Sequence, residues 1–154
     1  MSVDSADAQF VDSVGYLLVR AARAHRAVVG RGLAKLGLHP GQELLLAALW
    51  GAEPLAQGKL IERLQVEPPT VTKALKRMEH SGLVQRSRAP HDGRVVMIEL
   101  TPAGRALESR VRALWDQTEE ALLAGLSCED RERARKLLAG LHANMLPAAP
   151  GEKT

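Results

Sequence analysis

Cysteine, aromatic residues and long apolar runs are all scarce in this chain of 154 residues. The single cysteine, Cys128, excludes an intrachain disulfide. Aromatic residues make up 3% of the chain, so we expect a core built mainly from Leu, Val and Ala. No apolar run approaches the roughly 18–20 residues that a membrane-spanning helix needs. The sequence therefore predicts one domain or compact protomer that does not span a membrane.

The N-terminal segment MSVDSADAQF also lacks the features of a secretory signal. It is acidic and polar, with no basic segment followed by an apolar one. Together with the single cysteine, this favours a cytoplasmic location.

Arrangements of residues that support catalysis or metal binding are absent as well. The chain has no glycine-rich phosphate loop and no nucleophile elbow. Its five histidines are scattered without metal-ligand spacing: His25, His39, His80, His91 and His142. We therefore expect no enzyme activity, no cofactor and no metal site.

Positive charge gathers in the middle of the chain. Residues 59–94 contain eight Lys and Arg against four Asp and Glu, a local charge of +4, whereas the whole chain carries +3. This distribution is typical of a surface that faces a polyanion, although a mildly basic solvated surface is an equal alternative on charge alone.

Apolar periodicity and turn residues predict a mostly α fold with a small β-hairpin. The hairpin is expected from two β-rich runs, 83–88 and 94–100, joined by the turn sequence APHDG. Helices are expected over 8–36, 42–50, 55–64, 68–81, 101–124 and 128–145. No internal repeat is present.

The segment EPPTVTKALKRM (67–78) places two prolines directly before a helical pattern. Proline costs little in the first turn of a helix, where backbone N–H groups have no intrahelical partner. Pro68 and Pro69 therefore mark a sharp helix start. The N–H groups near Thr70 and Val71 are expected to be free to approach a phosphate or a base edge.

A helical wheel divides this segment into two faces. Val71, Ala74, Leu75 and Met78 form the face expected to be buried. Thr72, Lys73, Lys76 and Arg77 form a face of hydroxyl and cationic groups. A short helix, a turn and a helix with such a face follow the helix-turn-helix plan, and a basic hairpin is what a winged helix adds.

These residues resemble the multiple antibiotic resistance regulator (MarR) family of bacterial transcription factors over about 38–107. The family's wing pattern, Asp-x-Arg, a strand, then Leu-Thr-x-x-Gly, occurs here as Asp92, Arg94, Leu100, Thr101 and Gly104. TVT before a basic helix, followed by GLV, is similar to its recognition helix and strand start. The resemblance implies a winged helix-turn-helix transcription factor that binds DNA.

The resemblance assigns DNA-binding roles to individual residues. Arg94 would reach the minor groove from the wing tip, with Asp92 pairing to it or holding the turn. Arg86 and Arg88 would contact phosphates. The residues in or over the major groove would be Pro69, Thr70, Thr72, Lys73, Lys76 and Arg77. Reading of guanine by Lys73 or Arg77 is possible, and bidentate reading of adenine is not expected.

Many members of this family release DNA when a small aromatic or anionic effector binds. The effector pocket is expected between the dimer helices and the winged module. Its candidate residues are Tyr16, Arg20, Arg23, His25, His39, Gln42 and Trp50, each with ordinary packing or surface exposure as the alternative. A redox role for Cys128 is a further alternative, because the thiol lies near a helix N-terminus.

The long terminal helices need a partner for their apolar stripes, and a second copy of the chain supplies one. We therefore expect a homodimer with an N-terminal dimerisation helix (1–37), a DNA-binding module (38–101), C-terminal dimerisation helices (102–146) and a frayed tail (147–154). The expected function is a sequence-specific regulator, acting as a repressor on a pseudo-palindromic duplex. A winged-helix module that binds protein instead of DNA is the alternative.

Overall fold

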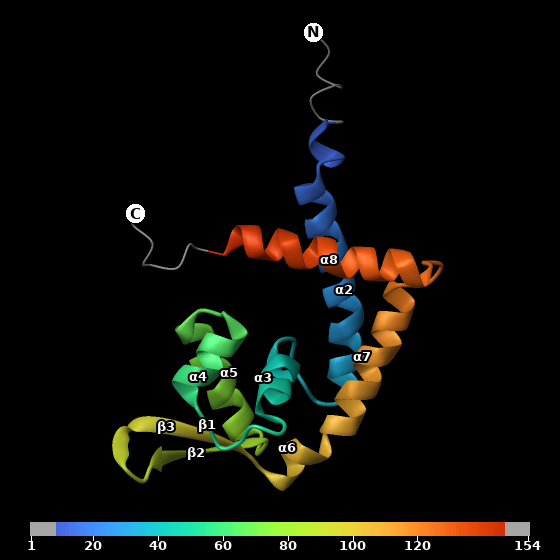
Figure 1. Cartoon of the computed structure of the whole chain (residues 1–154). Helices are drawn as coiled ribbons and strands as arrows, with labels where there is room; N and C mark the ends of the chain where they lie inside the picture. Colours follow the sequence, from blue (N-terminus) through green and yellow to red (C-terminus); the bar gives the residue numbers. More distant parts are fainter. Residues whose placement is uncertain (1–8, 147–154) are drawn as a thin grey trace, which may run out of the picture. The chain divides into compact units, whose positions relative to one another are not determined.

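The computed structural model describes residues 9–146 and confirms a mostly helical fold with a β-hairpin (Figure 1). These residues form two compact units, one ending at Thr118 and the other beginning at Glu119. The expected frayed tail, 147–154, lies outside the described residues. The helices are α2 (Val14–Lys35), α3 (Gln42–Leu49), α4 (Gln57–Leu64), α5 (Pro68–His80), α6 (Pro102–Ala106), α7 (Glu108–Leu122) and α8 (Cys128–Met145), and the strands are β1 (Leu55–Ala56), β2 (Val84–Ala89) and β3 (Asp92–Leu100).

The sheet is antiparallel, with strand order β1-β3-β2. Strands β2 and β3 form the predicted hairpin, here called the wing, and Val84 pairs with Leu100 at its base. Figure 1 shows α3, α4 and α5 grouped beside this sheet. Aliphatic side chains from these elements form one core, which includes Leu46, Leu60, Leu75, Met78, Ile98 and Leu100. The scarcity of aromatic residues is thus matched by a core made mainly of Leu, Val and Ile side chains.

Three predicted helices differ from the observed elements. The first is interrupted because the Ser13 hydroxyl caps a new helix by accepting from the Tyr16 N–H. Leu55 and Ala56 are extended, not helical, because they pair with Ile98 and Met97 of β3.

The helix expected over 101–124 is divided into α6 and α7 at Leu107. Its start at Thr101 and Pro102 is confirmed, since the Thr101 hydroxyl accepts from the Gly104 N–H.

The helix α5 begins and ends as its sequence predicts. Pro68 and Pro69 occupy its first turn. Gly82 adopts a φ of +70°, and the N–H groups of Gly82 and Leu83 donate to the carbonyls of Glu79 and Met78. This is the Schellman arrangement that glycine permits at a helix C-terminus.

The base of the wing is fixed by the residues that follow β3. The Thr101 N–H donates to the Leu83 carbonyl, and the Thr101 hydroxyl donates to the Gly82 carbonyl at 2.5 Å. A Cβ atom added to Gly104 would lie 2.2 Å from the Leu83 carbonyl oxygen. The Leu-Thr-x-x-Gly pattern therefore couples the wing to α5 through backbone contact that only glycine allows.

Candidate nucleic-acid interface

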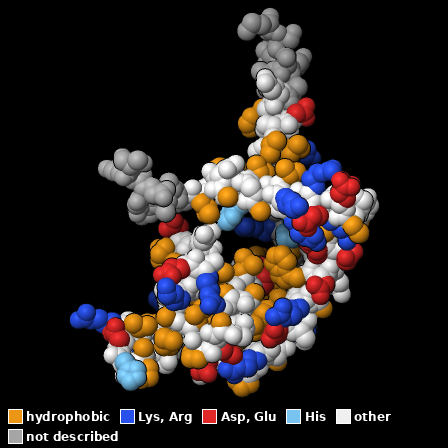
Figure 2. All heavy atoms as spheres, viewed as in Figure 1, with side chains coloured by type: hydrophobic (Ala, Val, Ile, Leu, Met, Phe, Trp, Pro, Cys, Tyr) orange, Lys and Arg blue, Asp and Glu red, His pale blue; other side chains and the backbone are white. Residues whose placement is uncertain are grey.

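The two faces predicted for α5 are present in the structure. Val71, Leu75 and Met78 are fully buried, and Ala74 is half-buried. Lys73, Lys76 and Arg77 are exposed on the opposite side. Figure 2 shows Lys and Arg side chains over α4 and α5 and at the tip of the wing. Burial of the apolar face thus holds the cationic face towards solvent.

The cations of α5 and the wing differ from those of α8 in their pairing. Arg133, Arg135 and Lys136 of α8 all pair with nearby carboxylates. Within residues 9–146, no ion pair engages the side chains of Lys73, Lys76, Arg77, Arg88 and Arg94. A cluster of cations without carboxylate partners is suited to an external polyanion.

At the wing tip, Asp92 holds the turn. Its Oδ1 accepts from the Arg94 backbone N–H at 2.9 Å. The Arg94 guanidinium makes no ion pair in the described part of the chain and is exposed. Of the two alternatives for Asp92, the observed contact is the one with the backbone, which leaves the Arg94 side chain available.

Arg86 and Arg88 lie on β2 in different surroundings. Arg86 is half-buried, and its Nε donates to Glu79 of α5 at 2.8 Å. This ion pair connects the wing to α5. It also neutralises much of the charge of Arg86, which was predicted to contact phosphates. Arg88 is exposed, so its side chain remains open to solvent.

The first turn of α5 corrects one expectation about its donors. The N–H groups of Thr70 and Val71 were expected to be free, but both donate to the Glu67 carbonyl, at 3.0 and 3.3 Å. Glu67 is the N-cap residue of α5, and the carbonyl of an N-cap residue accepts the first intrahelical hydrogen bonds. The half-buried Thr72 hydroxyl accepts from Gln57 Nε2 at 3.1 Å, which ties α5 to α4. Pro69 and Thr70 are exposed.

The residues predicted for an effector pocket lie in different surroundings within residues 9–146. Arg20 lies over the ring of Tyr16 on α2, with Arg23 exposed further along the helix. His25 is half-buried, with its ring centroid 5.6 Å from that of Trp115. Gln42 is buried and accepts from the His39 N–H at 2.9 Å.

Trp50 is the member of that set that lines a cavity between α3 and α7. The cavity has a volume of about 390 Å³. The Arg112 guanidinium lies over the Trp50 ring, 5.5 Å from its centroid. The lining residues from α7 were not predicted, because they follow α3 by some 60 positions in the chain. The full lining is Leu44, Ala47, Trp50, Val111, Arg112, Trp115 and Asp116.

Other kinds of site are not seen in the part of the chain that the structure describes. Residues 9–146 contain no group of three or more His, Cys, Asp or Glu side chains placed to hold a metal ion. None of the described helices is both long and apolar enough to cross a membrane. Cys128 is exposed at the first position of α8.

Comparison with known proteins agrees with this geometry. Residues 38–96 match the model of the MarR family. The organic hydroperoxide resistance transcriptional regulator of Bacillus subtilis is 34% identical over 110 residues, which cover 71% of each chain. This chain belongs to the MarR family.

Two further relatives extend the likeness to the terminal helices. The repressor Rv2887 of Mycobacterium tuberculosis is 29% identical over 128 residues, 83% of this chain and 92% of that protein. The structure of Bordetella bronchiseptica BpsR, whose DNA binding is regulated by 6-hydroxynicotinic acid, has a TM-score of 0.80 at 27% identity, covering 86% of this chain and 95% of that one. The MarR-family chain described here is therefore a winged helix-turn-helix transcriptional regulator and not an enzyme.

Proposed function

We propose that this MarR-family chain acts as a homodimeric repressor that binds a pseudo-palindromic DNA duplex and releases it when a small aromatic acid binds. The observation that carries the DNA-binding part is the set of unpaired cations on α5 and the wing. In this arrangement α5 enters the major groove, with Pro69, Thr70, Thr72, Lys73, Lys76 and Arg77 in or over it. Arg94 reaches the adjacent minor groove, and Arg88 contacts phosphates.

The homodimer is supported by apolar side chains that stay exposed on the terminal helices. On α2 these are Val14, Leu17, Leu18 and Val19, and on α8 they are Leu137, Leu138, Leu141 and Met145. Figure 2 shows hydrophobic side chains gathered on α2. Contiguous apolar faces of this kind mark association surfaces, and a second copy supplies the matching face. Two-fold symmetry would then place the half-sites about one helical turn of DNA apart.

The role of a repressor is supported by the similarity to Rv2887, which is named as one. A repressor acts by occupying its DNA site. The regulated genes should therefore be expressed when binding of the small aromatic acid releases the DNA.

Arg94→Ala should weaken binding to a selected duplex by about 1–3 kcal/mol, because a side chain inserted in the minor groove is lost. Fluorescence anisotropy of a labelled duplex, taken from a random pool by selection, measures this effect. The matched control is Arg110→Ala, which removes an exposed arginine of α7. If Arg94→Ala and Arg110→Ala bind the duplex equally well, the role of the wing is wrong.

The cavity between α3 and α7 fits a planar aromatic acid as effector. Its lining is mainly apolar and aromatic, with one cation, Arg112, and one carboxylate, Asp116. Arg112 also pairs with Glu108 at 2.7 Å. An acid bound here would have to pair with Arg112 and lie away from Asp116. BpsR responds to a hydroxylated aromatic acid, which supports the same ligand class here.

Because the two tryptophans of the chain both line this cavity, quenching of tryptophan fluorescence by 6-hydroxynicotinic acid should report its occupancy directly. Arg112→Gln should raise the acid concentration needed for half-maximal quenching by about tenfold or more, since a hydrogen bond to a charged group is lost. Glu119→Gln on the exposed surface is the control. An unchanged titration for Arg112→Gln would show that the acid does not bind through this arginine.

A further inference from the structure

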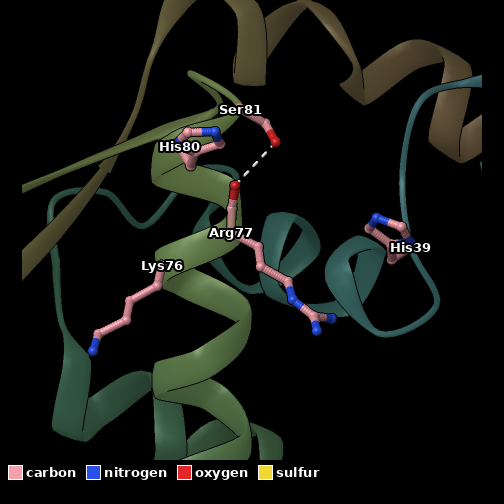
Figure 3. Close-up of a pocket in the computed structure, with 5 residues that line it drawn as sticks. All are labelled: His39, Lys76, Arg77, His80 and Ser81. Atoms are coloured by element: carbon pink, nitrogen blue, oxygen red, sulfur yellow. Dashed lines mark hydrogen bonds between the residues drawn. The ribbon is translucent and has the colours of Figure 1, made fainter.

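A second hollow, of about 560 Å³, lies on the outer side of α5 and is lined by His39, Lys76, Arg77, His80 and Ser81. Figure 3 shows the Arg77 side chain directed towards His39, which belongs to the loop between α2 and α3, whereas Lys76 lies on the other side of the α5 axis. His80 stands one turn after Arg77, and the Ser81 hydroxyl donates to the Arg77 carbonyl at 2.9 Å. Two imidazoles and two permanent cations therefore surround one concave surface.

The charges around this hollow favour an anion. None of the residues that line it, within the described range 9–146, is a carboxylate. Of the acidic groups on the neighbouring elements, Glu79 is paired with Arg86 of β2. Glu43 at the start of α3 is buried and accepts from the Gly41 N–H at 2.7 Å, and burial raises the pKa of its carboxyl. Little negative charge thus opposes an anion bound there.

We propose that this hollow is a binding site for a backbone phosphate of DNA, here called the phosphate seat. Arg77 and His39 are its main contacts, and Lys76 and His80 lie at its rim. The inference rests on the proposed function, because Lys76 and Arg77 also belong to the cationic face of α5. It assigns Arg77 to the backbone and not to a base, and moves His39 from the effector pocket to the DNA surface.

The imidazoles give this seat a signature that other phosphate contacts lack. Histidine ordinarily changes charge between about pH 5 and pH 8. A phosphate beside the ring favours the protonated form, so DNA binding takes up protons. Affinity is therefore greatest at low pH and falls as pH rises. Each linked proton changes the association constant by at most about tenfold per pH unit.

The test is anisotropy at constant ionic strength between about pH 8 and pH 6. It uses the full chain with a duplex selected from a random pool and with a mixed-sequence duplex of the same length. The wild type should gain roughly three- to tenfold in affinity for both duplexes as pH falls. His39→Gln and His80→Gln should each reduce this gain, and the double variant should lose most of it. His142→Gln on α8 is the matched control and should keep the wild-type profile.

The variant His39→Lys is a further test, because the introduced lysine keeps its positive charge at high pH. At about pH 8 it should bind more tightly than the wild type, and as pH falls to about 6 it should keep only the smaller gain that His80 supplies. Phosphate contacts carry no sequence information, so every change should be similar on the two duplexes.

A pH profile that is the same in the wild type and in the His39→Gln/His80→Gln variant overturns the phosphate seat while leaving DNA binding intact. Wild-type binding that does not respond to salt overturns the proposed function itself, and the seat with it.

Discussion

Leu137→Glu/Leu141→Glu should convert the protein to a monomer and weaken its binding to a palindromic duplex by about 10²–10⁴-fold. The two leucines lie one helical turn apart on α8 and are 62% and 37% exposed in the single chain. Two-fold symmetry would place each new carboxylate in the interface twice, where burial of an unpaired charge is costly. Loss of the dimer removes the second half-site contact, so binding loses its avidity.

Sedimentation velocity at micromolar concentration measures the first effect, and anisotropy with the selected duplex measures the second. The control Lys136→Glu adds a carboxylate to the opposite side of α8, at a residue whose side chain is 76% exposed. It should remain a dimer. If the double variant sediments as the wild type does, α8 is not part of the association surface.

Gly104→Ala should destabilise the protein by about 1–3 kcal/mol. The new Cβ would lie 2.2 Å from the Leu83 carbonyl oxygen and 3.1 Å from Leu100 Cδ2. A backbone atom cannot swing aside as the end of a flexible side chain does, so the base of the wing must move away from α6. The hydrogen bonds that Thr101 makes to Leu83 and Gly82 would be disturbed by the same movement.

Urea unfolding followed by far-UV circular dichroism measures the change as a lower midpoint at similar slope. Gly58→Ala is the matched control, since a Cβ there meets nothing within 4 Å. At that helical position alanine should leave stability unchanged or raise it by up to about 1 kcal/mol. Equal midpoints for Gly104→Ala and the wild type would show that the close contact at the wing base is not maintained in solution.

Local sequence signals predicted both ends and the buried face of α5. The two prolines and Gly82 gave both ends of α5, because the first turn tolerates proline and the C-terminus requires a left-handed residue. The helical wheel separated Val71, Leu75 and Met78 from the cationic face. This prediction succeeded because an amphipathic helix packs against the core on one side only.

What sequence reasoning missed depends on contacts between distant residues. Leu55 and Ala56 become a strand only because β3, some 40 residues later, offers backbone partners. The pairing of Arg86 with Glu79 requires knowing how the wing folds back on α5. The cavity residues Arg112, Trp115 and Asp116 lie on a helix whose facing side is set by packing against α3. No local pattern distinguishes these residues from ordinary surface and core.

If the cationic surface formed by α5 and the wing binds DNA, the affinity must depend strongly on salt concentration. A plot of log association constant against log salt concentration for the selected duplex should fall steeply, with a slope of about −0.9 for each phosphate neutralised. Lys76→Ala should flatten that slope by about one unit. A wild-type affinity that does not change with salt would exclude DNA binding by this surface and favour a winged-helix module that binds protein.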